Sequence, residues 1–175
     1  MEKRNVTAGV YSTHEAAGQA VGELRTAGYD LEKVSLIGRD CCLGEHVSGF
    51  YKAGERLLFR GKLEPFWSRL AGELAPSASF FVPGIGQVML FGPLVEWLNS
   101  ALERNLVVGG LSAVGAALFS IGLPKECIVK YEKAIKAGRF LVVASGGADE
   151  AELAREILNR KSDNDAVVYH SSAPD

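Results

Sequence analysis

The sequence predicts an α+β fold of ferredoxin-like type, with a four-stranded sheet made from two β-α-β halves. Three observations support it: a strand-helix-strand pattern opens the chain, the same pattern closes it, and an apolar, glycine-rich insertion separates them. Halves of this size cannot bury both faces of a sheet alone, so we expect them to combine. We expect one domain over 1–175, with halves at 1–40 and 139–170, an insertion at 41–138 and a tail at 171–175.

The first half begins with the apolar, β-branched segment Val6–Tyr11, which is typical of a strand. Ser12 and Glu15 have the spacing of a capping box, which predicts that a helix starts there. One apolar stripe then runs along the helix at Ala16, Ala17, Ala20, Val21 and Leu24. Gly28 is placed to end this helix in the left-handed conformation, and Val34–Gly38 is predicted as the second strand.

The last part of the chain repeats this plan. Phe140–Ala144 is predicted as a strand, Asp149–Arg160 as a helix and Ala166–Tyr169 as a strand. An offset of 134 residues superposes Ala17 on Ala151, Ala20 on Ala154, Leu24 on Leu158 and Val34 on Val168. The identity is low, but the helix face is the same, so we interpret the two halves as a structural pseudo-repeat.

Prolines and glycines divide the insertion into short elements. Leu74–Val95 has no charged residue, yet its three prolines exclude one continuous helix. The apolar segments 80–82 and 88–91 flank Pro83, Gly84, Ile85 and Gly86, which predicts a β-hairpin closed by a type II turn.

Two helices are predicted after this hairpin. Leu94–Leu102 is typical of a short amphipathic helix and carries Trp97. Pro124 is expected at the first position of a helix over Lys125–Lys136, which Gly138 ends.

Asn105–Pro124 is a second uncharged stretch and, as one helix, would be long enough to cross a hydrocarbon core of ~30 Å. It contains two rows of small residues that would let helices approach closely: Gly109, Ala113 and Ala117, and Ser112, Ala116 and Ser120. Two halves that share a sheet lie on one side of a membrane, so crossings must be even in number. The other uncharged stretch is interrupted by prolines, so we favour packing in a core or oligomer over membrane contact, and membrane contact over spanning.

The sequence contains one cluster of possible metal ligands, and the evidence that it forms a site is weak. Cys41, Cys42, Glu45 and His46 are ligand types that suit zinc, but vicinal cysteines without a C-x₂-C pair or a second cluster do not predict a metal site. Their alternative interpretation is a loop with partly buried thiols.

Lys52, Arg56 and Arg60 would form a basic stripe if they lay on one helix. Such a stripe could contact phosphate or an anionic membrane surface, although a solvated helix face is the interpretation we favour.

No catalytic or cofactor motif is present. Gly84-Ile85-Gly86 lacks the third glycine and the following helix of a dinucleotide site. His14 is expected in the first turn of a helix and His170 at the end of a strand, and no serine has a G-x-S-x-G context. We therefore expect no cofactor and no enzymatic activity.

Charge and cysteine content constrain partners and compartment. Nineteen basic residues against 21 acidic residues give a net charge of −2, which does not favour nucleic-acid binding. Three cysteines do not form an even disulfide framework, and the N-terminus has no apolar leader. We expect a cytoplasmic protein, with association at the inner face of the cell membrane as an alternative.

Several glycine- and proline-containing motifs occur in order along the chain. They are Ala8-Gly9-Val10-Tyr11, Glu15-Ala16-Ala17, residues 24–29, Val34-Ser35-Leu36, residues 82–86, Gly92-Pro93-Leu94, Gly122-Leu123-Pro124, Tyr131-Glu132 and residues 138–142. In this order they resemble the bacterial general-stress and heat-induced stress proteins, a family that includes low-temperature-induced proteins. The resemblance implies the fold and a stress association, but it transfers no catalytic residue. The basic and aromatic residues of 50–70 depart from it.

We therefore expect a non-enzymatic, stress-associated protein that forms a homodimer through its glycine-rich insertion. The insertion carries more apolar surface than a four-stranded sheet with two helices requires, and such surfaces often form interfaces. The alternatives are a peripheral or re-entrant membrane protein, and a sensor that binds a small ligand near the turn at Pro83–Gly86.

Overall fold

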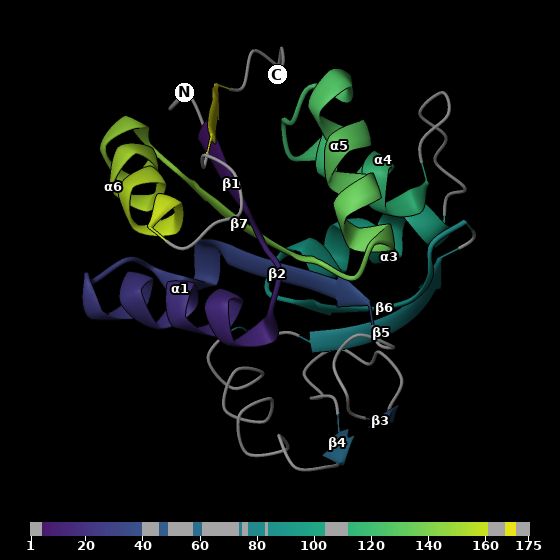
Figure 1. Cartoon of the computed structure of the whole chain (residues 1–175). Coiled ribbons are helices and arrows are strands. Elements are labelled where there is room, and N and C mark those ends of the chain that lie inside the picture. The colour runs from purple at the N-terminus through teal and green to yellow at the C-terminus, as the bar shows by residue number, and fades with distance from the viewer. Residues whose placement is uncertain are drawn as a thin grey trace.

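The structure, a computed structural model, describes residues 5–39, 46–48, 58–60, 74, 77–82, 84–103, 112–160 and 167–170. It is an α+β fold (Figure 1). The elements are β1 (Asn5–Tyr11), α1 (His14–Thr26), a 3₁₀ turn (Leu31–Lys33), β2 (Val34–Arg39), β3 (His46–Ser48), β4 (Leu58–Arg60), β5 (Ser77–Val82), β6 (Gly86–Phe91), α3 (Leu94–Glu103), α4 (Ala113–Ser120), α5 (Lys125–Lys136), β7 (Phe140–Gly146), α6 (Ala148–Asn159) and β8 (Val167–His170).

The main sheet has six described strands in the order β5-β6-β2-β7-β1-β8, and all neighbours are antiparallel. The two predicted halves, β1-α1-β2 and β7-α6-β8, interleave in it, because β7 lies between β1 and β2. The expected number of four strands is too small. The predicted hairpin adds β6 and β5 to the edge at β2, which widens the sheet. β3 and β4 form a separate two-stranded sheet.

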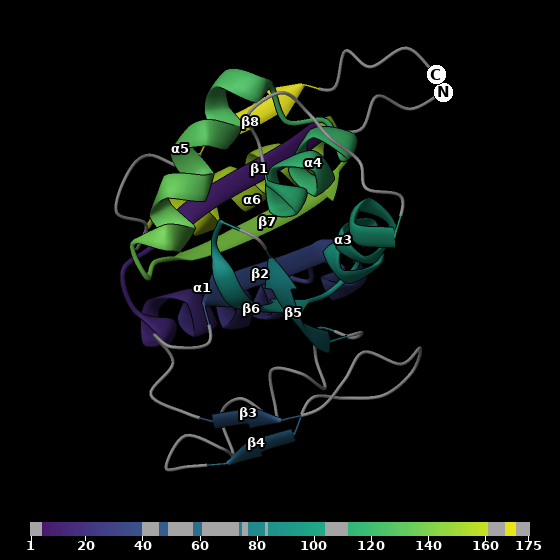
Figure 2. The same cartoon turned by 90° about the vertical axis from the view of Figure 1, so that its right-hand side faces the viewer.

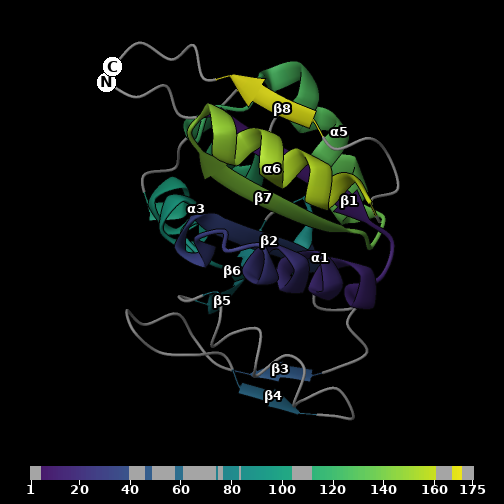
Figure 3. The same ribbon diagram turned by 90° about the vertical axis from the view of Figure 1, so that its left-hand side faces the viewer.

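Helices cover both faces of the main sheet. α1 and α6 lie on one face (Figure 3), and α3, α4 and α5 lie on the other (Figure 2). Alternate residues of β7 serve the two cores: Phe140, Val142 and Ala144 pack with α1 and α6, and Leu141 and Val143 pack on the opposite side. The helices of the insertion therefore cover the second face of the sheet. This packing buries much of the apolar surface of the insertion, which exceeds what a four-stranded sheet with two helices requires.

The pseudo-repeat is a feature of the α1/α6 face. The matched helix positions are all buried, namely Ala17, Ala20 and Leu24 of α1, and Ala151, Ala154 and Leu158 of α6, and all of them except Ala151 belong to one core cluster. Tyrosine and threonine hydroxyls also tie the halves together there. Tyr11 donates to the carbonyl of Leu158 at 2.7 Å, Tyr29 to that of Ser145 at 2.6 Å, and Thr7 to that of Ala151 at 3.2 Å.

Helix ends follow the predicted signals with small shifts. The cap of α1 is Thr13 and not Ser12, because the Thr13 side chain accepts a hydrogen bond from the Ala16 amide at 3.1 Å. Gly28 has a φ of +84°, and the amide of Tyr29 donates to the Leu24 carbonyl, so α1 ends as predicted. Pro124 precedes α5 as its N-cap and does not occupy the first helical position.

The insertion is also built largely as predicted. Gly84 has a φ of +88°, and the Ile85 amide donates to the Val82 carbonyl at 3.0 Å, as in a type II turn. α3 matches the predicted amphipathic helix. The uncharged stretch before Pro124 contains only the eight-residue α4 within the described residues, and no described helix is long and apolar enough to cross a membrane.

Candidate functional site

A groove of about 500 Å³ lies between α5 and the end of β1. Its lining residues are Val10, Glu126, Val129, Lys130, Lys133, Ala134, Ala137 and Arg139. Because six of them belong to α5 or its C-cap and Val10 to β1, the groove belongs to the α3/α4/α5 face of the sheet.

The periodicity of α5 explains why these side chains meet. Its buried positions, Ile128, Tyr131, Glu132 and Ile135, point into the protein. Glu126, Lys130, Lys133 and Ala137 follow one another at three- and four-residue steps, so they form a second row along the helix.

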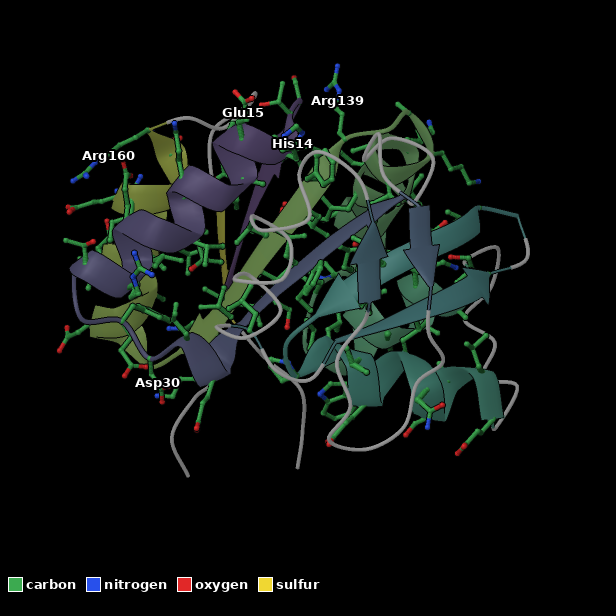
Figure 4. All side chains as sticks on the ribbon, turned by 90° about the horizontal axis from the view of Figure 1, so that it is seen from below. His14, Glu15, Asp30, Arg139 and Arg160 are labelled. Atoms are coloured by element: carbon green, nitrogen blue, oxygen red, sulfur yellow. The ribbon has the colours of Figure 1, made fainter. Side chains whose placement is uncertain are left out.

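The turn that ends α5 adds Arg139 to this row. Gly138 has a φ of +89°, and the Arg139 amide donates to the Ala134 carbonyl at 3.0 Å, which closes the helix. β7 begins at the next residue, so the arginine is placed between helix and strand. Its side chain is exposed and projects from the edge of the molecule (Figure 4).

Three cations and one carboxylate line the groove. Lys130 Nζ lies 5.5 Å from the centre of the Tyr131 ring. Neither Lys133 nor Glu126 takes part in an ion pair among the described residues. Lys133 and Glu126, which line the same groove as the buried Val10, can therefore bind ligand groups of opposite charge.

Next to the groove, a pair of tyrosines joins α5 to β8. The hydroxyls of Tyr131 and Tyr169 are 2.5 Å apart, and their rings meet edge to face with centres 6.2 Å apart. Burial raises the pKa of Tyr131, and burial and the hydrogen bond to Tyr131 raise the pKa of Tyr169. Both groups are therefore neutral hydroxyls near pH 7. Cys127, a free and half-buried thiol, lies one turn before Tyr131 and also contributes to the raised pKa of Tyr169.

The buried carboxylate of Glu132 positions α4. It accepts hydrogen bonds from the amide and the hydroxyl of Ser112, both at 2.9 Å. The Ser112 oxygen in turn accepts from the Gly115 amide at 3.4 Å, which caps the first turn of α4. Ser112, a predicted packing residue, is thus a helix cap inside its own chain.

The other predicted packing residues are not gathered on one open surface. Ala116 and Ala117 are buried in the core of the chain, Ala113 is half-buried, and the exposed Ser120 donates to the Ala116 carbonyl at 2.9 Å. Gly109 lies outside the described residues. At the hairpin, Ile85 is buried against the core, Gly84 is exposed and Gly86 is half-buried, while Pro83 lies outside the described residues.

The predicted anion and metal candidates are only partly described. Lys52 and Arg56 lie outside the described residues, and Arg60 belongs to β4, so the helical stripe is wrong at its last position. Cys41, Cys42 and Glu45 lie outside as well, and His46 begins β3. In the described part of the chain, no group of three His, Cys, Asp or Glu side chains could hold a metal ion. His14 starts α1 and His170 ends β8, as predicted.

Sequence reasoning missed the groove. The helix that carries Glu126, Lys130 and Lys133 was predicted with the right bounds, so its charged row could have been found. That Val10, 116 residues before Glu126, lines the same groove depends on the tertiary fold and has no local signal. No family model, curated protein or solved structure matches this chain.

Proposed function

We propose that this chain is a non-enzymatic protein that binds a small anionic molecule in the groove beside α5. The observation that carries the proposal is that Lys130, Lys133 and Arg139 line one groove together with the buried Val10. Its volume of about 500 Å³ falls in the range that small-molecule sites occupy. The proposal keeps the ligand-sensor interpretation and moves its site from the Pro83–Gly86 turn to α5.

We also propose that the core of the fold is ferredoxin-like. The support is the order β8-β1-β7-β2, which places both β-α-β halves in one antiparallel sheet with α1 and α6 on the same face. In this proposal, β5, β6, α3, α4 and α5 are additions that cover the second face. An experimental structure with a different order of these four strands would contradict it.

The ligand proposal is tested by thermal unfolding of the full chain with pyrophosphate or citrate at constant ionic strength. An anion that binds only the folded protein raises the unfolding midpoint. Lys133→Gln should weaken this binding about fivefold, since one partly exposed charge contact contributes about 1 kcal/mol. Lys125→Gln is the matched control, because Lys125 is an exposed lysine of α5 outside the groove. Equal effects of the two substitutions, or no shift with either anion, would overturn the proposal.

Self-association is a second candidate, favoured by two exposed aromatic side chains on the insertion. Trp97 of α3 is 41% exposed and Phe119 of α4 is 49% exposed. We propose a homodimer that buries them, and a peripheral membrane protein is the alternative that uses the same side chains. Light scattering of the wild type and of Trp97→Ser/Phe119→Ser tests the dimer, and sedimentation with anionic liposomes tests the alternative. A monomeric wild type that does not sediment contradicts both. The stress association is proposed on the motif resemblance alone.

A further inference from the structure

The groove is polarised along its length. Glu126 lies in the first turn of α5, whereas Lys133 lies in its last turn and Arg139 follows its end. The seven residues from Glu126 to Lys133 correspond to about 10 Å along a helix. The acceptor and the main anion-binding groups therefore stand at opposite ends of the groove.

Between these ends, the groove is lined by four apolar residues and by Lys130. Val10 of β1 is 4% exposed, and Val129, Ala134 and Ala137 line the helix side. Small aliphatic side chains give a smooth surface on which a ring can lie. A ligand that follows the groove therefore needs an apolar middle section between two polar ends.

The cationic end favours a dianion. Lys133 and Arg139 line this end of the groove, and Lys130 lies one turn before Lys133 on the same helix. The arginine guanidinium also presents paired donors that match the oxygens of a phosphate group. At the other end, the Glu126 carboxylate only accepts hydrogen bonds, so it favours an amine or hydroxyl and repels a second anion.

Building on the proposed function, we infer that the ligand is a phosphate monoester with a flat aromatic ring that carries a hydrogen-bond donor at its far end, as adenosine monophosphate does. The phosphate binds Lys133 and Arg139, the ring lies against Val10 and Val129, and the donor reaches Glu126. Glu126 is therefore a specificity-determining residue in this assignment, and no bond is made or broken.

Titration calorimetry of the full chain at constant ionic strength tests this inference with three probes: inorganic phosphate, adenosine monophosphate and purine riboside monophosphate, which lacks the amine. We expect adenosine monophosphate to bind at least about tenfold more tightly than inorganic phosphate, and more tightly than the probe without the amine. If phosphate or pyrophosphate binds in a Lys133-dependent way but neither nucleotide binds more tightly, the inference fails and the proposed function stands. If no anion binds, both fail.

Glu126→Gln gives the second and sharper test, because the substitution should change the affinity for the nucleotide and for inorganic phosphate in different directions. For an oriented ligand, the variant loses a charged acceptor, and adenosine monophosphate should bind about threefold or more weakly. For inorganic phosphate, the variant loses a repulsive charge, so binding should be unchanged or tighter. Glu156→Gln, an exposed glutamate of α6 on the opposite face of the sheet, is the charge-matched control. Tighter binding of the nucleotide by Glu126→Gln would overturn the assignment.

Discussion

The two helical layers of the molecule differ in how they use polar groups. On the α1/α6 face, side-chain hydroxyls of one half bind backbone carbonyls of the other, as Tyr11 does with Leu158 and Thr7 with Ala151. On the α3/α4/α5 face, the contacts that join different elements include a bond between two side chains, Tyr131 with Tyr169, and a bond at a helix cap, Glu132 with Ser112. In the α1/α6 layer, side-chain hydroxyls thus provide hydrogen-bond donors for backbone carbonyls. The α3/α4/α5 layer, which the insertion forms, also carries the charged groove.

This difference separates stability from binding. The α1/α6 layer has matched alanines and leucines that let helices lie close to the sheet, and the hydroxyls of Thr7, Tyr11 and Tyr29 bond to residues more than 100 positions away. The other layer has an equally buried core, but α5 turns a row of charged side chains outward beside that core. Substitutions should therefore affect unfolding most where the layers attach to the sheet, and affect binding most along α5.

The largest effect on the free energy of unfolding is expected where the chain passes from the sheet into the α3/α4/α5 layer. Gly92 joins β6 to α3 with a φ of +94°, and a Cβ there would lie within 2.2 Å of the Val34 carbonyl oxygen. Gly92→Ala combines backbone strain with a clash against backbone, so it should lower the free energy of unfolding by about 3 kcal/mol or more. Urea denaturation measures this loss.

Gly84→Ala is the matched control for that substitution. Gly84 has a similar φ of +88°, but a Cβ there would meet no atom within 4 Å. It should therefore cost only the backbone strain, about 1 to 2 kcal/mol. Equal losses for the two variants would mean that the close approach at Val34 is not what fixes the start of α3.

The contrast between layers also marks what the sequence could and could not predict. The periodic alanines of α1 and α6 are local signals, and so are Gly28 and Gly138, which follow α1 and α5. The bounds of these three helices were therefore predicted to within about a residue. The attachment of the hairpin to β2 was missed, because strand pairing depends on contacts distant in sequence. The groove was missed for the same reason, since Val10 and the charged row of α5 come to line one groove only in the folded chain.

Removing a tyrosine hydroxyl should have a smaller effect on the free energy of unfolding than Gly92→Ala, and this effect should differ between the two layers. Tyr11 is fully buried, and its hydroxyl satisfies the carbonyl of Leu158 in the last turn of α6, so Tyr11→Phe should cost about 1 to 2 kcal/mol. The Tyr131 hydroxyl bonds to the partly exposed Tyr169, which can turn to water, so Tyr131→Phe should cost about 0.5 to 1 kcal/mol. Chemical denaturation of both variants measures the order. A larger loss for Tyr131→Phe would show that the second layer depends on its polar contacts as much as the first does.

The smallest effect concerns an ion pair at the rim of the α1/α6 layer. Lys33 of the first half donates to Glu150 of α6 at 3.0 Å and 3.1 Å, and the Gly147 amide donates to the same carboxylate at 3.2 Å. The hydrogen bond from Lys33 and then that from Gly147 lower the pKa of Glu150. A carboxyl whose pKa is lower in the folded state stabilises the protein above its unfolded pKa, and this contribution is lost as the pH falls through the folded value.

Glu150→Gln should therefore destabilise the protein at pH 7 by less than about 1 kcal/mol, because the carboxylate is 44% exposed and water screens the pair. The difference between wild type and variant should shrink as the pH is lowered from about 5 to about 3, since the wild-type carboxylate becomes protonated. Unfolding midpoints in urea across this range measure it, with Glu156→Gln as a control for removing one charge from α6. A difference that stays constant with pH would assign the loss to the shape of the side chain and not to its charge. Among the polar side-chain contacts between the halves, the hydroxyl bonds of Thr7, Tyr11 and Tyr29 would then be the ones that stabilise the fold.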